Sequence, residues 1–531
     1  MSGTASRYRT LDPTPDSGTL IRPLAPQPLT AQPLALQFLA LRHLAIGALI
    51  LGGLSAAALF GEFDAVSSDA GQHYALVRAL MDLDGWRGPA LTPNLGALPH
   101  YPPVAHWMAA GIGKLLNSGL LGMMAVADAA VGLFYLAMFA LTSRINWRVP
   151  LVACLITIVY ALCRGPVFGR QIVNNFFFAQ VVGSTIAAWA LLIVLLKFHK
   201  WKGIVLDGFV LAIGQIVVAT HLTPAAQLLA AYCTILLVQA WAGSSWKIFG
   251  RLVFFAATSL VLTFLNPFAR ELISVAQQGG GAHINHLLGH RLVQLSLLIL
   301  AGFSSARLIL KSYRTEDAGL FLGCMCLAAC GLAFVQMALL GVGIGSEYAI
   351  MKHLFVIVAL FIFVLAANLF FKADTVPGIR VPGPWAQLAL CSVLALLAMR
   401  VDLLPSIVKL DRAVVFQRAV RVLGGRIERP DGRVPIVLAS VWPPNISYAI
   451  MIGDLRVPMG TADQVLLGGP IDAGLVAVVL MPSDDPLIVP DCAVAGYSNP
   501  LVTALDYSCF LRNSKMKVPK LAAGDPVRVL R

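Results

Sequence analysis

The residues that could do chemistry gather first in the stretch SSDAGQHYALVRALMDLDGW, which begins at Ser67 shortly after the first long apolar run. A carboxylate in a short helix beside a membrane can serve as a general base for a hydroxyl group, and Asp69 is the candidate here. His73 follows four residues later on the same helical face, where it could share a ligand with Asp69 or tune its charge. Alternatively, Asp69 or Ser68 only caps the helix that runs through Arg78. These residues alone leave both interpretations open.

A second polar stretch, HYPPVAHW, begins at His100. Its two prolines fix an extended turn before a helix, and His106 and Trp107 would then lie at the depth of the lipid headgroups. An aromatic belt around a helix that starts at a proline is the alternative. The segment from Pro103, PVAHWMAAGIGKLLNSG, contains His106 and Lys114 and is short for a span. We expect it to be an interfacial helix, because a span here would reverse every later loop.

The composition indicates whether these stretches belong to a soluble protein or to a membrane protein. Of 531 residues, 58% are apolar and only 12% are charged, whereas a soluble globular protein carries about 25% charged residues. Apolar runs of the length that a bilayer requires recur along the chain, so we expect a polytopic membrane protein. The net charge of +13 lies mostly in short clusters at the ends of apolar runs, such as KFHKWK at 197–202. Such clusters are topology signals and argue against nucleic-acid binding.

Eleven apolar runs are candidate spans. Basic clusters follow in alternate loops, which places those loops and the N-terminus in the cytoplasm and the C-terminal tail outside. The polar side chains then fall in the outward loops 62–120, 164–175, 220–221, 267–291 and 342–353, as an enzyme at the outer surface would need. The predicted spans are 44–61, 121–142, 149–163, 176–196, 204–219, 222–241, 248–266, 292–310, 318–341, 354–371 and 384–399.

The two ends of the chain differ from this body. Residues 1–43 are rich in Pro, Thr and Arg without a cleavable signal, which predicts a disordered cytoplasmic lead before a transmembrane domain at 44–400. Residues 401–531 predict a small soluble α/β domain, with a helix at KLDRAVVFQRAVRVLGG and strands at PIVLASVW, LVAVVLM and around Tyr507. Cys492 and Cys509 form a disulfide in that outer domain or remain two buried thiols. The other seven cysteines lie in or beside apolar segments, where buried small side chains are expected rather than a metal site.

The two polar stretches together carry a resemblance. Asp69, Tyr74, Gly85-Trp86 and Tyr101-Pro102-Pro103 with Trp107 resemble the first outer loop of the GT-C superfamily of membrane glycosyltransferases. The pattern is most similar to the protein O-mannosyltransferases and the lipid A aminoarabinose transferases. It departs from them in two places. Most relatives have Asp-Glu where this chain has Asp69-Ala70, which weakens a two-acid or metal-binding role. The aminoarabinose branch has a lysine where this chain has Tyr101, which makes aminoarabinose a poor candidate for the sugar.

The resemblance implies an inverting transfer of a sugar from a polyprenyl phosphate to a hydroxyl of a lipid, protein or polysaccharide at the outer face. Asp69 would deprotonate that hydroxyl, and outward cations would stabilise the leaving lipid phosphate. Four outward cations are expected to hold the phosphate: Arg170, Lys352, Arg270 and Arg291. Arg164 and His290 are further outward candidates. The expected pocket residues are His73, Tyr74, Tyr101, His106, Asn174, His221 and Tyr348.

Each of these assignments has an alternative. Arg170 has Asn174 one helical turn on, yet it could simply snorkel at the end of a span. Lys352 shares a face with Tyr348, and its place at an outer boundary runs against the usual distribution of positive charge, which favours a functional role. A lone histidine such as His221 is more often a satisfied core residue.

Metal dependence stays open, so no cofactor is certain and a divalent metal is possible. His286 and His290 are one turn apart, with Glu271 as a nearby acid, but the glycines of VAQQGGGAHINHLLGHR favour a flexible loop that covers substrate. Asp128, inside a predicted span, either has a function or bonds to a neighbouring helix.

Two other classes of function compete with a glycosyltransferase. A transporter or flippase of lipid-linked sugars would often show paired inverted repeats, and none is recognisable here. A non-catalytic cell-envelope assembly factor would use its outer domain to bind a partner. We therefore predict an α-helical GT-C-like protein of the inner (cytoplasmic) membrane with an outward α/β domain and a polyprenyl-phosphate-linked sugar as its partner.

Overall fold

The computed structural model describes the chain in part, and all described residues belong to the second of two compact units, Leu44–Arg531. The N-terminal lead, the first and last predicted spans and the amphipathic segment after Val401 lie outside the described residues. The described residues are 69–81, 101–162, 167–175, 177–269, 290–313, 317–344, 347–371, 434–437, 475–483, 488–494, 500, 502–506, 509 and 512–513.

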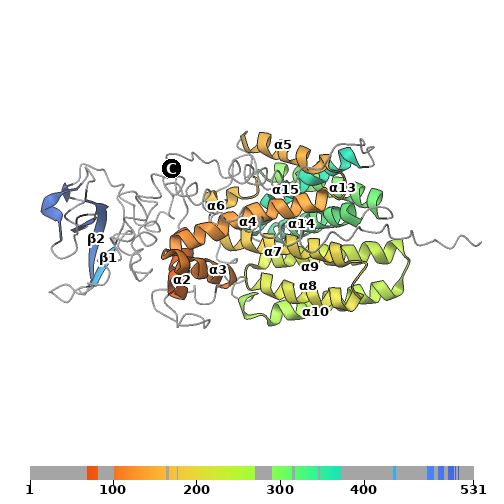
Figure 1. The fold of residues 1–531 in the computed structure, drawn as a ribbon, viewed down its shortest axis with the longest axis horizontal. Helices are drawn as coiled ribbons and strands as arrows, with labels where there is room; N and C mark the ends of the chain where they lie inside the picture. Colours follow the sequence, from red (N-terminus) through yellow and green to blue (C-terminus); the bar gives the residue numbers. More distant parts are fainter. Residues whose placement is uncertain are drawn as a thin grey trace, which may run out of the picture. The chain divides into compact units, whose positions relative to one another are not determined.

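Helices make up the described part before residue 372 (Figure 1). They are α2 (Asp69–Met81), α3 (Val104–Leu116), α4 (Gly119–Thr142), α5 (Arg148–Leu162), α6 (Arg170–Asn175), α7 (Phe178–Lys197), α8 (Gly203–Val218), α9 (Leu222–Ala242), α10 (Trp246–Leu265), α13 (Arg291–Ser312), α14 (Asp317–Gly341) and α15 (Glu347–Phe370).

Each predicted span between residues 121 and 371 coincides with one of these helices. The largest difference is at α15, which begins at Glu347 instead of residue 354. An acidic residue in the first turn stabilises a helix N-terminus, and this turn lacks the apolar character by which the span was recognised. Tyr348, Lys352 and His353 therefore lie on a helix and not in the loop at 342–353 where the sequence placed them.

Seven of the described helices are long and apolar enough to cross a membrane: α4, α7, α9, α10, α13, α14 and α15. Two helices at predicted spans are short for a bilayer, as their predicted ranges already were, since α5 has 15 residues and α8 has 16. At a rise of about 1.5 Å per residue these helices measure roughly 22–24 Å, less than the hydrocarbon core of about 30 Å.

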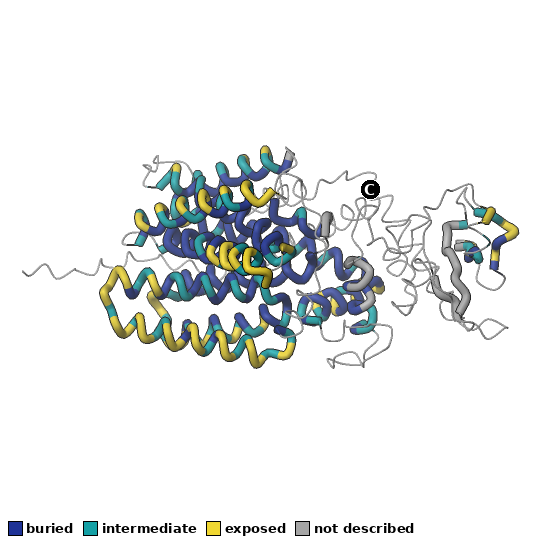
Figure 2. Tube along the Cα trace, turned by 180° about the vertical axis from the view of Figure 1, so that it is seen from behind, coloured by how far each residue is buried: buried dark blue, intermediate teal, exposed yellow. Residues whose placement is uncertain are grey.

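The helices differ in how far they are buried (Figure 2). α4, α7, α14 and α15 are mostly buried, whereas only a minority of the residues of α10 and α13 are buried, and several of their exposed residues are large and apolar. Side-chain hydrogen bonds tie two inner helices together: Thr185 Oγ1 donates to the carbonyl of Ala130 at 2.7 Å, and Trp189 Nε1 donates to that of Leu133 at 3.0 Å. Apolar side chains on an outer helix suit contact with lipid.

Contacts at the helix ends follow the predicted alternation of loops. At one end, the amide of Val104 donates to the carbonyl of Ala219, joining the start of α3 to the end of α8. At the other end, His199 after α7 pairs with Asp317 at the start of α14, 2.5 Å apart. The segments predicted to face outward thus meet each other, and so do those predicted to face the cytoplasm.

A close approach between α3 and α4 positions the short helices of the first outer loop. A Cβ added at Gly122 of α4 would lie 2.2 Å from the carbonyl oxygen of Ala109 and 2.5 Å from the amide of Gly113, so only glycine allows these two backbones to meet. Ser118 caps α4 by accepting the amide of Leu121 at 3.3 Å. α3 itself has 13 residues, with one buried face against α2 and α4 and exposed Met108 and Leu115 on the other.

A polar network lies among the first turns of α8 and α10 and the middle of α9. Arg251 donates to both carboxylate oxygens of Asp207, at 2.6 and 2.7 Å, and to the carbonyl of Gly203 at 2.8 Å. The hydroxyl of Tyr232 donates to the same carboxylate at 2.8 Å. The network satisfies two opposite charges at once, which is the condition for keeping them inside an apolar bundle.

The described strands form one sheet in the order β1-β2-β3: β1 (Val434–Val437), β2 (Leu475–Pro482) and β3 (Val502–Asp506). β1 pairs with β2 in parallel and β2 with β3 antiparallel. β2 coincides with the predicted strand LVAVVLM, and β1 overlaps the predicted strand PIVLASVW at residues 435–437, the rest of which lies outside the described residues. β3 ends just before Tyr507. Cys492 and Cys509 are joined by a disulfide, with Cα atoms 5.4 Å apart, so the alternative of two free thiols is wrong.

Candidate functional site

Two histidines from the first outer loop form the centre of the site. His73 on α2 and His106 on α3 are both buried, and the Nδ1 of His73 lies 2.8 Å from the Nε2 of His106. Their rings are stacked, with centroids 5.0 Å apart and planes 18° apart. The Nδ1 of His106 lies 3.2 Å from the carbonyl oxygen of Pro102.

The contact with Pro102 fixes the protons of this histidine pair. A carbonyl can only accept, so the Nδ1 of His106 carries the proton and donates it. In a neutral imidazole the Nε2 of His106 is then the acceptor, and His73 must donate from its own Nδ1. The Nε2 of His73 is left without a proton, which makes His73 an acceptor.

Aromatic rings enclose the pair. Tyr101 lies edge-on to both imidazoles, with centroids 5.2 Å from His73 and 5.5 Å from His106. Phe178, the first residue of α7, lies edge-on to both from another side, at 6.3 and 5.5 Å. The pair is therefore held by α2, by α3 with the turn before it, and by the start of α7.

Burial keeps both rings neutral. Loss of hydration lowers the pKa of His106 to about 3, although its bond to the Pro102 carbonyl acts in the opposite direction. Burial also lowers the pKa of His73 well below its ordinary value, and the nearby His106 and Lys352 lower it further. A positive Lys352 thus influences His73 from a distant part of the chain.

A second group lies at the starts of α9 and α15. The Nζ of Lys352 is 3.2 Å from the Nε2 of His221, which immediately precedes α9. The same Nζ lies over the ring of Tyr348, 4.1 Å from its centroid, and 5.1 Å from that of Phe177. Cation–π contacts of this kind stabilise a lysine charge that is partly removed from water. Burial lowers the pKa of His221, as do the nearby Lys352, His73 and His353.

Two glutamines fix the first turns of α15. Gln180 on α7 donates from Nε2 to the carbonyl oxygen of Lys352 at 2.5 Å. Gln227 on α9 pairs through Nε2 with the Nδ1 of His353 at 3.0 Å. Because an amide nitrogen can only donate, the Nδ1 of His353 accepts. The Oε1 of Gln180 is buried and has no hydrogen-bond partner among the described residues.

Together these residues form one basic site. The described contacts of His106 and His221 include no acidic side chain. A half-buried lysine beside neutral imidazoles that can donate hydrogen bonds favours an anionic ligand.

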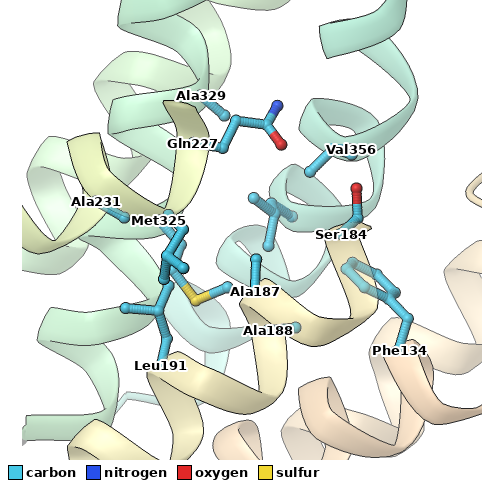
Figure 3. A pocket seen from close by; sticks show the side chains of 12 residues that line it. Phe134, Ser184, Ala187, Ala188, Leu191, Gln227, Ala231, Met325, Ala329 and Val356 are labelled. Atoms are coloured by element: carbon cyan, nitrogen blue, oxygen red, sulfur yellow. The ribbon is translucent and has the colours of Figure 1, made fainter. Parts of the chain in front are cut away.

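A small cavity lies deeper in the bundle, beside Gln227 (Figure 3). Its volume is about 30 Å³, and its walls come from α4, α7, α9, α14 and α15. Gln227 and Ser184 are the polar residues in an otherwise apolar lining, and the Ser184 hydroxyl has no hydrogen-bond partner among the described residues. The space is sufficient for water molecules that would hydrate these two groups.

The structure brings together six of the residues predicted to form the site. They are His73, Tyr101, His106, His221, Tyr348 and Lys352.

Other predicted residues lie elsewhere or outside the described residues. Tyr74 is buried in the core and packs against Gly119 at the start of α4. Arg170 is half-buried at the start of α6, and Arg291 is exposed at the start of α13. The side chains of Asp69 and Asn174 and the whole of Arg270 lie outside the described residues, as do Arg164, Glu271 and His286, so the assignment of Asp69 as base or cap stays a prediction.

Four residues of the site were not predicted from the sequence: Phe177, Phe178, Gln180 and Gln227. A signal was present for the two glutamines, because a polar amide near the start of an apolar span is costly unless it has a role. No comparable signal marked the phenylalanines, which are ordinary residues in such a segment.

The described residues give no ligand-binding role to Asp128 and no cluster for the possible metal ion. Asp128 is fully buried on α4, and neither of its carboxylate oxygens has a hydrogen-bond partner among the described residues. Within the described part of the chain, no three His, Cys, Asp or Glu side chains are grouped to hold a metal ion.

No family model and no curated protein matches the chain. Among solved structures, the crystal structure of ArnT from Cupriavidus metallidurans bound to undecaprenyl phosphate is similar, with 11% identity over 89% of this chain and 98% of that chain and a TM-score of 0.46. ArnT is a lipid A aminoarabinose transferase of the GT-C type, one of the two groups that the sequence resembles.

Proposed function

We propose that this chain is a GT-C-type membrane glycosyltransferase that moves a sugar from a polyprenyl phosphate to a hydroxyl acceptor at the outer face. One observation carries the proposal. His73 and Tyr101, which flank or belong to the GT-C-like motif of the first loop, meet Lys352 and His221 in a single, partly buried basic site. Segments far apart in the sequence thus converge where a lipid phosphate would need positive charge.

The reaction needs a base and an anion site, and the chain offers both. Asp69 starts α2, one helical turn before His73, and would take the proton from the acceptor hydroxyl. The acceptor oxygen then attacks the anomeric carbon from the face opposite the phosphate, and the bond between that carbon and the phosphate oxygen breaks with inversion. Lys352 would bind the phosphate as negative charge develops on the leaving oxygen.

The orientation in the membrane is part of the proposal. Residues 62–120, the start of α15 and the tail from residue 401 would face outward, and residues 1–43 the cytoplasm. The Cys492–Cys509 disulfide supports an oxidising location for the tail, since such bonds persist mainly outside the cytoplasm.

Replacement of the base tests the proposal. The purified chain in nanodiscs would be given polyprenyl phosphates carrying different radiolabelled sugars, and both transfer and release of polyprenyl phosphate would be measured. Asp69→Asn should lower transfer about a hundredfold or more while lipid binding is retained. Asp82→Asn, which removes a carboxylate from the same loop, is the matched control and should transfer normally.

Unchanged transfer by Asp69→Asn would remove Asp69 from the reaction. Transport of a lipid-linked sugar across the bilayer without any cleavage of the phosphate linkage would support a flippase instead.

A further inference from the structure

The position of the proton on His221 follows from the start of α9. His221 caps this helix in an extended conformation, and its Nδ1 accepts the backbone amide of Thr223 at 3.2 Å. An accepting nitrogen must keep its lone pair, so a neutral imidazole carries its single proton on Nε2. The cap therefore holds His221 in the tautomer that donates from Nε2.

That donor points at another donor. The Nε2 of His221 is 3.2 Å from the Nζ of Lys352, and a lysine ammonium has three N–H groups and no lone pair. Two N–H groups at this distance do not satisfy each other. An anionic oxygen that accepts from both nitrogens would turn the contact into two charge-assisted hydrogen bonds.

The surroundings favour such an oxygen. The positive end of the α9 dipole begins at the residue after His221, and the charge of Lys352 is held over the rings of Tyr348 and Phe177. His221 is almost fully buried, so water competes poorly for its proton. The described partners of His221 include no carboxylate.

We propose that His221 and Lys352 bind one phosphate oxygen of the polyprenyl-phosphate donor together, so that the leaving group is held between the starts of α9 and α15. The inference rests on the proposed function and adds to it. It makes His221 a direct ligand of the lipid phosphate, and not merely a helix cap or a satisfied core histidine.

Substitution can separate the two roles of His221, which are capping α9 through Nδ1 and donating a hydrogen bond from Nε2. Asparagine and serine are good N-caps, so His221→Asn and His221→Ser keep an acceptor for the Thr223 amide but lose the Nε2 donor. The chain in zwitterionic nanodiscs would be titrated with polyprenyl phosphate, with polyprenol and with inorganic phosphate. Thermal unfolding of each variant would confirm that the cap is retained, and Lys352→Met would serve as the comparison.

Both His221 variants should bind polyprenyl phosphate about tenfold to a hundredfold more weakly, with polyprenol binding unchanged. Lys352→Met should lose the preference for the phosphate, and adding His221→Asn to it should cost little more, because both residues hold the same oxygen. Inorganic phosphate should bind far more weakly than the lipid. Binding as tight as the lipid's would identify a site for free anions and overturn the lipid assignment.

The remaining outcomes separate this inference from the proposed function. Normal affinity in the His221 variants, with the preference for phosphate lost in Lys352→Met, would overturn the role of His221 alone. Normal affinity in all three variants would overturn the phosphate site itself. An equal loss of polyprenol and polyprenyl phosphate binding would show that His221 only shapes the pocket, which also overturns the inference.

Discussion

The buried histidines predict how the stability of this protein depends on pH. His106 has a pKa of about 3 in the folded chain because it is removed from water, against an ordinary value of 6.5. In the unfolded chain it would take up a proton below pH 6.5, whereas in the folded chain it stays neutral down to about pH 3. The unfolded state therefore binds more protons in this window, and stability falls as the pH is lowered through it.

The magnitude follows from the two pKa values. Between pH 7.5 and pH 5.0, protonation of the unfolded state should remove about 2 kcal/mol of folding free energy through His106 alone. His73 and His221 have pKa values lowered in the same direction by burial and by neighbouring positive groups, so each adds to the loss. The three together would cost at most about 6 kcal/mol, since each contributes no more than the full titration of one unfolded histidine over this range.

The assay is unfolding in mixed micelles at pH 7.5 and pH 5.0, followed by tryptophan fluorescence. His106→Asn keeps an amide donor near the Pro102 carbonyl but cannot titrate, so it should lose about 2 kcal/mol less than the wild type over this range. Gly111→Ala, on the same helix at a position where an added Cβ meets nothing within 4 Å, should keep the wild-type dependence. An identical loss in the wild type and in His106→Asn would refute a buried neutral His106.

Two further predictions use the same unfolding measurement at pH 7.5. Gly122→Ala should destabilise the chain by about 3 kcal/mol or more, because its Cβ would overlap the backbone of α3. Gly111→Ala, the control, should be neutral or slightly stabilising. Equal effects of the two substitutions would contradict the close approach of α3 and α4. Arg251→Met should lower the free energy of unfolding by about 3 kcal/mol, because the Asp207 carboxylate loses its partner. The double variant with Asp207→Leu should recover most of that loss. No recovery would show that the ion pair itself supplies the stability.

The helices of the bundle could be predicted because their physical cause is local. A long apolar run flanked by basic residues needs a bilayer and satisfies its own backbone only as a helix. The start of α15 was missed because SEYAIMKH mixes polar and apolar residues, and no local rule shows that the turns at Tyr348 and Lys352 pack against α7 and α9.

The candidate site was predictable as a set of residues but not as an arrangement. His73 and His106 are polar residues in an outward loop, which makes them candidates. Their direct contact across 33 positions depends on how α2 and α3 pack on α4, and that packing depends on the glycine contact at Gly122. The proton positions in His106 and His221 follow only once the partners of each ring nitrogen are known.

The start of α7 shows why a motif search finds only half of this site. Phe177 contacts the lysine and Phe178 contacts both histidines of the first loop, while Gln180 holds the backbone of Lys352. None of these three residues can be charged, and only Gln180 stands out in an apolar segment. They nevertheless set the geometry between α2, which begins at the proposed base, and α15, which carries the proposed phosphate ligand. A helix start without ionisable groups thereby connects the helix of the proposed base with the helix of the proposed phosphate ligand.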